Sequence, residues 1–115
     1  MPTETNLSSL ALPAPVATYF ATYAEHPDAA AACFSADGVV LDEARAHRGR
    51  AAIAAWLRDV AARYRYRSEP LTADARGAHL TVVSRVTGEF PGSPLMLRFG
   101  FTLADEAITK LEIAP

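Results

Sequence analysis

The stretch of residues 33–57 constrains the fold of this chain more than any other. It contains a short apolar run at residues 39–41 that ends on a carboxylate, Asp42. β-Branched apolar runs of this kind are usually buried strands. A charged loop at residues 43–50 follows, and a new helical pattern begins after Gly49. The stretch therefore predicts a turn at Asp37-Gly38, then a buried strand whose last carboxylate either faces water or lies at the mouth of a pocket.

Two longer helices are predicted by apolar residues at helical spacing. The first begins behind Pro13 and Pro15, which suit the first turn of a helix, and carries one apolar stripe: Val16, Tyr19, Phe20 and Tyr23. His26-Pro27-Asp28 ends this helix and starts a second, short one. The third helix follows Gly49 and has the most regular stripe: Ile53, Trp56, Leu57, Val60 and Tyr64. We expect three helices in the front half of the chain.

After residue 62 the apolar residues no longer recur at helical spacing but at every second position, which is typical of strands. Tyr64 and Tyr66 alternate there with arginines, and Pro70 limits how far this strand can be central in a sheet. Further strands are predicted at residues 79–87, 95–103 and 108–113, with turns at 74–77 and 104–107 and a proline-rich loop at 88–94. Helices in the N-terminal half of the sequence and hairpins in the C-terminal half indicate an α+β fold. We expect a cone in which a curved antiparallel sheet wraps around three N-terminal helices.

Composition places the chain among globular proteins of one domain. It has 115 residues, of which 50% are hydrophobic, and a formal net charge of −2, which argues against a general nucleic-acid binder. The single cysteine, Cys33, excludes an intrachain disulfide. No signal peptide and no segment of the ~20 apolar residues that a membrane span needs are recognisable. We expect a loose arm at residues 1–12, one domain at 13–115 and a cytoplasmic location.

Several pieces of the chain follow one another in the order of a known family. They are FSADGVVLD at residues 34–42, GRAAIAAW at 49–56, and TGEFPGSP at 87–94 followed by RFGFTL at 98–103. In this order and spacing the chain resembles the nuclear transport factor 2-like superfamily, in particular its SnoaL-like and ketosteroid-isomerase-like branches. The resemblance extends from about residue 15 to residue 113. It implies the cone described above and a homodimer formed through the outer sheet face, where Arg85 and Arg98 are expected.

The resemblance also implies candidate catalytic residues. The isomerase-like enzymes place a basic aspartate at the end of the first strand, which Asp42 matches, and a hydrogen-bonding tyrosine on the first helix, which Tyr19 matches. They place a protonated acid on the strand at residues 95–103, where the inward positions of this chain are apolar. That departure argues against the ketosteroid isomerase reaction itself. His47, five residues beyond Asp42, could add acid–base chemistry near neutral pH.

Each of these candidates has a structural alternative. Asp42 could cap a turn or pair with Arg45 or Arg48 at the surface, and His47 could be a solvated loop residue. Aromatic and apolar residues could form a pocket wall or a plain core: Tyr23, Phe34, Trp56, Tyr64, Tyr66, Leu97 and Phe99. The arginines at residues 63–67 alternate with tyrosines on the opposite face, so they cannot form one stacking platform for single-stranded nucleic acid.

These observations predict a cone that takes a small apolar organic ligand without a cofactor. The chemistry would be acid–base catalysis of isomerase, cyclase or dehydratase type on an apolar carbonyl or polyketide-like substrate, with Asp42 as the base. The alternatives are a non-catalytic ligand-binding or dimerisation module and a cone filled by its own aromatic side chains. Three scattered histidines without a carboxylate at ligand spacing predict no metal site. We expect neither nucleic acid nor a membrane as a partner.

Overall fold

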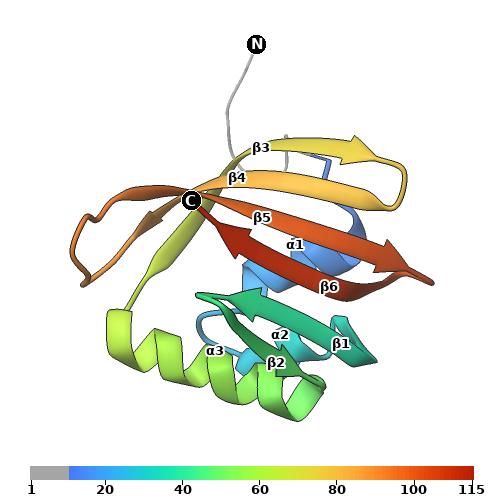
Figure 1. Cartoon of the computed structure of the whole chain (residues 1–115), viewed down its shortest axis with the longest axis horizontal. Helices are drawn as coiled ribbons and strands as arrows, with labels where there is room; N and C mark the ends of the chain where they lie inside the picture. Colours follow the sequence, from blue (N-terminus) through green and yellow to red (C-terminus); the bar gives the residue numbers. More distant parts are fainter. Residues whose placement is uncertain (1–10) are drawn as a thin grey trace.

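The computed structural model describes residues 11–115, which form three helices and six strands (Figure 1). The front half contains α1 (Ala14–Thr22), α2 (Pro27–Ala31), β1 (Phe34–Asp42), β2 (Arg45–Arg48) and α3 (Arg50–Tyr64). The back half contains only strands, namely β3 (Arg67–Arg76), β4 (His79–Thr87), β5 (Leu95–Ala104) and β6 (Ala107–Ala114). The predicted α+β class is confirmed.

All six strands belong to one curved sheet with the order β2-β1-β6-β5-β4-β3. Strand β1 runs parallel to β6, and the other neighbouring strands of the described sheet are antiparallel. The helices lie on one side of this sheet (Figure 1). β3 forms one edge of the sheet, which suits Pro70 because proline has no backbone N–H to donate to a neighbouring strand.

The core lies between the helices and the inner face of the sheet. Tyr19 of α1 makes an edge-to-face contact with Phe101 of β5 at a centroid distance of 5.8 Å, and Phe20 makes a similar contact with Phe99 at 5.5 Å. Such pairs contribute ~0.5–1.5 kcal/mol each beyond their buried area. Helix α3 contributes four buried residues to the same core: Ile53, Ala54, Trp56 and Leu57. The predicted stripes on both long helices therefore face the core.

β1 begins earlier than the sequence predicts. It starts at Phe34 and passes through Asp37-Gly38, where its register with β6 shifts, so the turn predicted there is wrong. Gly38 is buried, and a Cβ atom at this position would lie 3.1 Å from the Cβ of Phe34 and 3.2 Å from the carbonyl oxygen of Ile108. The missing side chain of Gly38 therefore allows β1 and β6 to approach each other closely at this position.

Two other boundaries differ from the prediction. Residues 45–48 form β2 instead of a loop, because Glu43 and Ala44 adopt positive φ angles of 53° and 64° and close a tight hairpin. Asn-Gly or Asp-Gly usually signals such a turn, and neither is present. α3 continues to Tyr64 and is capped by Arg65 in the left-handed conformation, with a φ of 47°, so the strand predicted from residue 63 begins at Arg67 instead.

The remaining boundaries are close to the prediction. β4 covers the predicted residues 79–87, whereas β3 continues to Arg76, past the start of the turn predicted at 74–77. Of the predicted arm, residues 1–10 lie outside the described residues, and Leu12 packs against the core. Within residues 11–115 no helix combines the length and the apolar character that a membrane crossing requires.

Candidate functional site

A cavity of about 310 Å³ opens between α3, the end of β1 and the inner face of the sheet. This volume is at the lower end of the range for small-molecule sites. Its lining comes from β1 and the following turn, α3, β4, β5, β6 and two loops: Asp42, Glu43, Trp56, Val60, Tyr64, Tyr66, Val86, Phe90, Pro91, Leu95, Leu97, Phe99 and Ile113. Apart from the two carboxylates, this lining is mostly apolar and aromatic.

Asp42 is the last residue of β1 and is half-buried at the cavity. Burial, which disfavours the charged form, raises the pKa of this carboxyl, and the neighbouring Glu43 raises the pKa further. Hydrogen bonding with the indole of Trp56 and the proximity of His47 act in the opposite direction on that pKa. Among the described residues, no ion pair joins Asp42 to Arg45 or Arg48. The carboxylate therefore faces an apolar space without an arginine paired to it, and His47 is the basic residue whose proximity lowers its pKa.

His47 lies on β2, opposite Val40 of β1, and is partly buried. Its ring stacks on the indole of Trp56 with a centroid distance of 5.6 Å and an interplanar angle of 28°. It does not line the cavity itself. His47 can therefore influence the cavity through the position of Trp56 and through its proximity to Asp42.

Tyr19 and Tyr66 lie at different depths. Tyr19 is 1% exposed, packs against Phe34 and Phe101, and does not line the cavity. Tyr66 does line it, beside Asp42. Burial raises the pKa of the Tyr66 hydroxyl, and the neighbouring Tyr23 and Asp42 raise that pKa further, so this hydroxyl stays protonated at neutral pH.

A third tyrosine supports Tyr66 from behind. The Tyr23 ring lies 5.1 Å from the Tyr66 ring, and its hydroxyl accepts a hydrogen bond from the backbone N–H of Ser68 on β3. Burial raises the pKa of Tyr19, and the nearby Tyr66, Tyr23 and Asp42 raise that pKa further. The three tyrosines and the carboxylate thus lie close to one another, and of these Tyr66 and Asp42 line the cavity.

The structure places the predicted wall residues in two sets. Five line the cavity: Trp56, Tyr64, Tyr66, Leu97 and Phe99. Tyr23 and Phe34 do not line it, since Tyr23 packs behind Tyr66 and Phe34 is fully buried in the core. The inward strand positions Leu97 and Phe99 remain apolar, so no acid from β5 reaches this cavity.

The loop at residues 88–94 forms a part of the cavity wall that the sequence did not predict. Phe90 and Pro91 line the cavity because this loop folds back onto the end of α3. The backbone N–H of Glu89 donates a hydrogen bond of 2.7 Å to the carbonyl oxygen of Tyr64, and the Phe90 ring makes an edge-to-face contact of 5.9 Å with Tyr64. An aromatic residue inside a loop of glycines and prolines was the one available signal.

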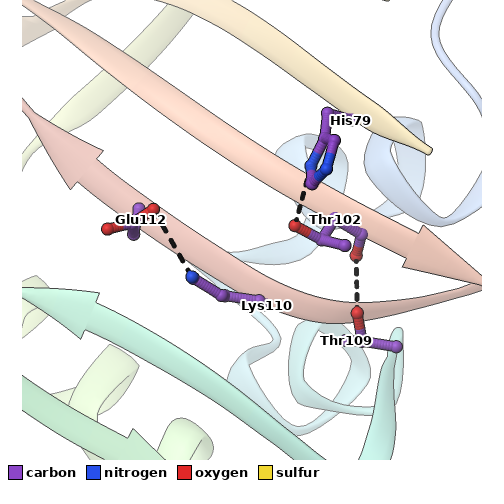
Figure 2. Close-up of polar contacts among 5 residues, drawn as sticks. All are labelled: His79, Thr102, Thr109, Lys110 and Glu112. Atoms are coloured by element: carbon purple, nitrogen blue, oxygen red, sulfur yellow. Dashed lines mark hydrogen bonds and ion pairs between the residues drawn. The ribbon is translucent and has the colours of Figure 1, made fainter. Parts of the chain in front are cut away.

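The outer face of the sheet carries pairs of polar side chains from neighbouring positions. Figure 2 shows His79 beside Thr102, with 3.2 Å between Nδ1 and Oγ1, and Lys110 beside Glu112, with 3.7 Å between Nζ and Oε1. The exposed side chains of Arg85 and Arg98 lie on this face as well. Among the residues that the structure describes, no group of three or more His, Cys, Asp or Glu side chains could hold a metal ion.

Comparison with known proteins identifies the family of this cone. The sequence matches the SnoaL-like domain over residues 16–111. The chain belongs to the SnoaL-like family. The SnoaL-like fold is shared by a candidate polyketide cyclase from Sinorhizobium meliloti, which is 38% identical over 90% of this chain and 95% of that chain, with a TM-score of 0.86. The predicted resemblance is thus confirmed.

More distant solved structures share the SnoaL-like fold. A protein with a ketosteroid isomerase-like fold from Catenulispora acidiphila, in complex with trimethylamine, is 23% identical over 90% of this chain and 85% of that chain, with a TM-score of 0.79. A candidate polyketide cyclase from Xanthomonas campestris is 22% identical over 87% of this chain and 86% of that chain, with a TM-score of 0.71. No curated protein matches the chain. At these identities the two structures support the fold alone.

Proposed function

We propose that this SnoaL-like domain takes a small, largely apolar carbonyl compound into the cavity and moves a proton at the carbon beside the carbonyl. Asp42 would be the base, and no cofactor would take part. The observation that carries the proposal is the position of Asp42, a half-buried carboxylate on the wall of an apolar cavity. The Sinorhizobium meliloti relative, a candidate polyketide cyclase, supports this class of chemistry.

The environment of Asp42 suits a general base. Burial raises the pKa of the carboxyl and brings it closer to neutral pH, where a base is most effective. Hydrogen bonding from the Trp56 indole would orient the carboxylate, and His47 would hold the indole by stacking on it. In the reaction, a carboxylate oxygen of Asp42 takes the proton from carbon, and the electron pair of the C–H bond moves into the carbonyl to form an enolate.

Tyr66 is the hydroxyl best placed to stabilise that enolate. It lines the same cavity as Asp42, whereas Tyr19 lies deeper in the core. Its protonated hydroxyl would donate a hydrogen bond to the enolate oxygen, and Asp42 would then return the proton to carbon. Tyr23 and Tyr19 would keep Tyr66 in position, and the ring contact of 5.1 Å between Tyr23 and Tyr66 supports this role.

The proposal can be tested by hydrogen–deuterium exchange at carbon. A panel of cyclic and open-chain ketones in heavy water would lose their α-proton signals in NMR spectra faster with the protein than without it. We expect Asp42→Asn to lower the exchange rate ~10²–10⁴-fold and Tyr66→Phe to lower it ~10²–10³-fold. Asp37→Asn is the matched control, because Asp37 is an exposed carboxylate on β1 outside the cavity. Exchange at the wild-type rate in Asp42→Asn would rule out this mechanism.

A second candidate function is ligand binding without catalysis. It is favoured by Leu97 and Phe99, which leave an enolate without an acid from β5. This function predicts that ketones shift the NMR signal of the Trp56 indole N–H while their α-protons do not exchange. Binding with exchange supports the enzyme, and binding without exchange supports the binding module.

We also propose that two copies of the chain associate through the outer sheet face. Met96 is 52% exposed on that face, next to Arg85 in the β4–β5 register and near Arg98. An exposed methionine between basic residues suits an interface with an apolar centre and a polar rim. Light scattering coupled to gel filtration should give the mass of a dimer for the wild type and of a monomer for Met96→Glu. A monomeric wild type would contradict this association.

A further inference from the structure

The cavity that the proposed function uses has an unbalanced charge. Among the described residues that line it, Asp42 and Glu43 are carboxylates and none is lysine, arginine or histidine. The same wall contains five aromatic rings, including those of Trp56, Tyr66 and Phe90. We propose that the cavity selects ligands that carry an alkylammonium cation, held between the aromatic wall and the two carboxylates. This inference rests on the proposed function only in that it concerns the same cavity.

The aromatic wall supplies the first part of the attraction. The face of an aromatic ring is electrically negative, and it attracts an ammonium group more strongly when water is excluded from the contact. Methyl groups on the nitrogen spread the charge and fit an apolar surface, so an alkylated amine suits this wall better than a free ammonium ion. Phe90 approaches from the loop and Trp56 from α3, so the rings reach the cavity from different elements.

The two carboxylates supply the second part. Asp42 and Glu43 are adjacent at the end of β1, and the mutual repulsion of their charges is one of the causes that raise the pKa of Asp42. A cation beside them would relieve this repulsion. A carboxylate ligand would increase it, and the buried side of the cavity offers no basic group to compensate.

Basic residues lie around the cavity, but none of them lines it in the described structure. Arg63 at the end of α3 forms an ion pair of 2.6 Å with Asp59, and Arg65 approaches Glu89 at 4.0 Å. Arg45, which is opposite Asp42 in the β1–β2 register, forms no ion pair with it in the described structure and lines a neighbouring hollow that also includes Asp42, Glu43 and Arg98. His47 lowers the pKa of Asp42 by its proximity but does not line the cavity, so within the cavity lining that the structure describes no basic side chain accompanies the two carboxylates.

A set of small probes of matched shape tests the charge preference. Choline would be compared with the uncharged alcohol in which carbon replaces its quaternary nitrogen, and with pivalate as a bulky anion. Titrations followed through the NMR signal of the Trp56 indole N–H would give each dissociation constant. We expect choline to bind about tenfold more tightly than its uncharged isostere and pivalate to give no saturable shift.

Variants locate the origin of the preference. Asp42→Asn combined with Glu43→Gln should make choline and its isostere bind equally, and Glu43→Gln alone, at an exposed turn, should reduce the preference in part. Glu89→Gln is the matched control, because it removes a nearby exposed carboxylate that does not line the cavity; it should leave the preference unchanged. An isostere that binds wild type as well as choline does, or a preference that survives the double variant, overturns the inference.

The outcomes also separate this inference from the proposed function. If ketones exchange their α-protons in an Asp42-dependent way and choline has no advantage over its isostere, the charge preference is wrong and the enzyme stands. If choline is preferred and no ketone exchanges, the cavity is a binding site for alkylammonium ligands and the proposed catalysis is wrong. If no probe and no ketone shifts the Trp56 signal, both fail.

Discussion

Replacing Gly88 with alanine should disturb the wall of the cavity and the stability of the fold together. A Cβ atom at this position would lie 2.9 Å from Cε2 of Phe90, 2.9 Å from the carbonyl oxygen of Tyr64 and 3.0 Å from the Cα of Tyr66. The last two are backbone atoms, one at the end of α3 and one in the connection to β3, so a change of side-chain rotamer cannot make room. Either this connection or the loop at residues 88–94 must move.

The cost follows from that geometry. Inserting a carbon into a closely packed site typically costs ~1–3 kcal/mol. A shift of the loop would also strain the hydrogen bond of 2.7 Å from Glu89 to Tyr64, and a hydrogen bond contributes about 1 kcal/mol. For a domain of this size, each kcal/mol lowers the melting temperature by roughly 3–6 °C. Together these terms cost ~1–4 kcal/mol, so we expect Gly88→Ala to melt roughly 3–24 °C below wild type.

Thermal unfolding followed by circular dichroism measures this change, and the NMR signal of the Trp56 indole reports on the cavity. Gly100→Ala is the matched control, since its added Cβ would lie 3.7 Å from the carbonyl oxygen of Glu112, an ordinary contact distance. We expect the control to melt no lower than wild type. If Gly88→Ala is as stable as the control and leaves the Trp56 signal in place, the packing of this loop against the α3–β3 connection is not what holds the cavity wall.

Three further predictions concern single side chains. The pKa of Asp42 is raised in the folded state, above its unfolded value of ~3.9. The folded protein therefore binds this proton more tightly than the unfolded chain does. The stability that the Asp42 carboxyl contributes is present below pH ~4 and is lost as the pH rises through the folded pKa. Asp42→Asn should thus be more stable than wild type in urea unfolding at pH ~7, with a difference that shrinks towards pH ~4; a constant difference would contradict the shift. Among the residues that the structure describes, the fully buried Ser84 hydroxyl has no hydrogen-bond partner. Ser84→Ala should therefore leave the free energy of unfolding unchanged or raise it by up to ~1 kcal/mol, and a clear loss would reveal a partner. Tyr23→Phe removes the acceptor of the Ser68 N–H and should lower the free energy of unfolding by ~1–3 kcal/mol; no loss would mean that this hydrogen bond is replaced.

The parts of the fold that could be predicted are those in which many consecutive residues carry the same signal. The α3 stripe repeats over four turns, and β5 alternates from Leu95 to Leu103, so an error at one position changes little. β2 was missed because its turn, Glu43-Ala44, adopts left-handed angles without the residues that usually indicate them. The end of α3 was misplaced because Tyr64 fits the helical stripe and the alternating pattern equally well.

The candidate site was predictable only in part, for a related reason. Asp42 stands out because it ends an apolar run. The helical phase of Tyr19 shows that it faces inward but not how deep it lies, and the structure gives the cavity position to Tyr66 instead. Phe90 reaches the cavity through contacts between a loop and a helix that are far apart in the sequence, and no local pattern encodes such a contact.

The position of β6 in the sheet determines when this protein can fold during its synthesis. β6 lies between β1 and β5 and pairs with both, although β1 is translated long before it. Until β6 leaves the ribosome, the β1–β2 hairpin that carries Asp42 has no further strand to pair with, and the two parts of the sheet, β2-β1 and β5-β4-β3, are not joined. The nascent domain therefore exposes apolar surface until β6 has been translated, and the cavity, which Ile113 of β6 lines, can form only then. Stalling the ribosome before β6 should leave a chain that chaperones hold and proteases cut.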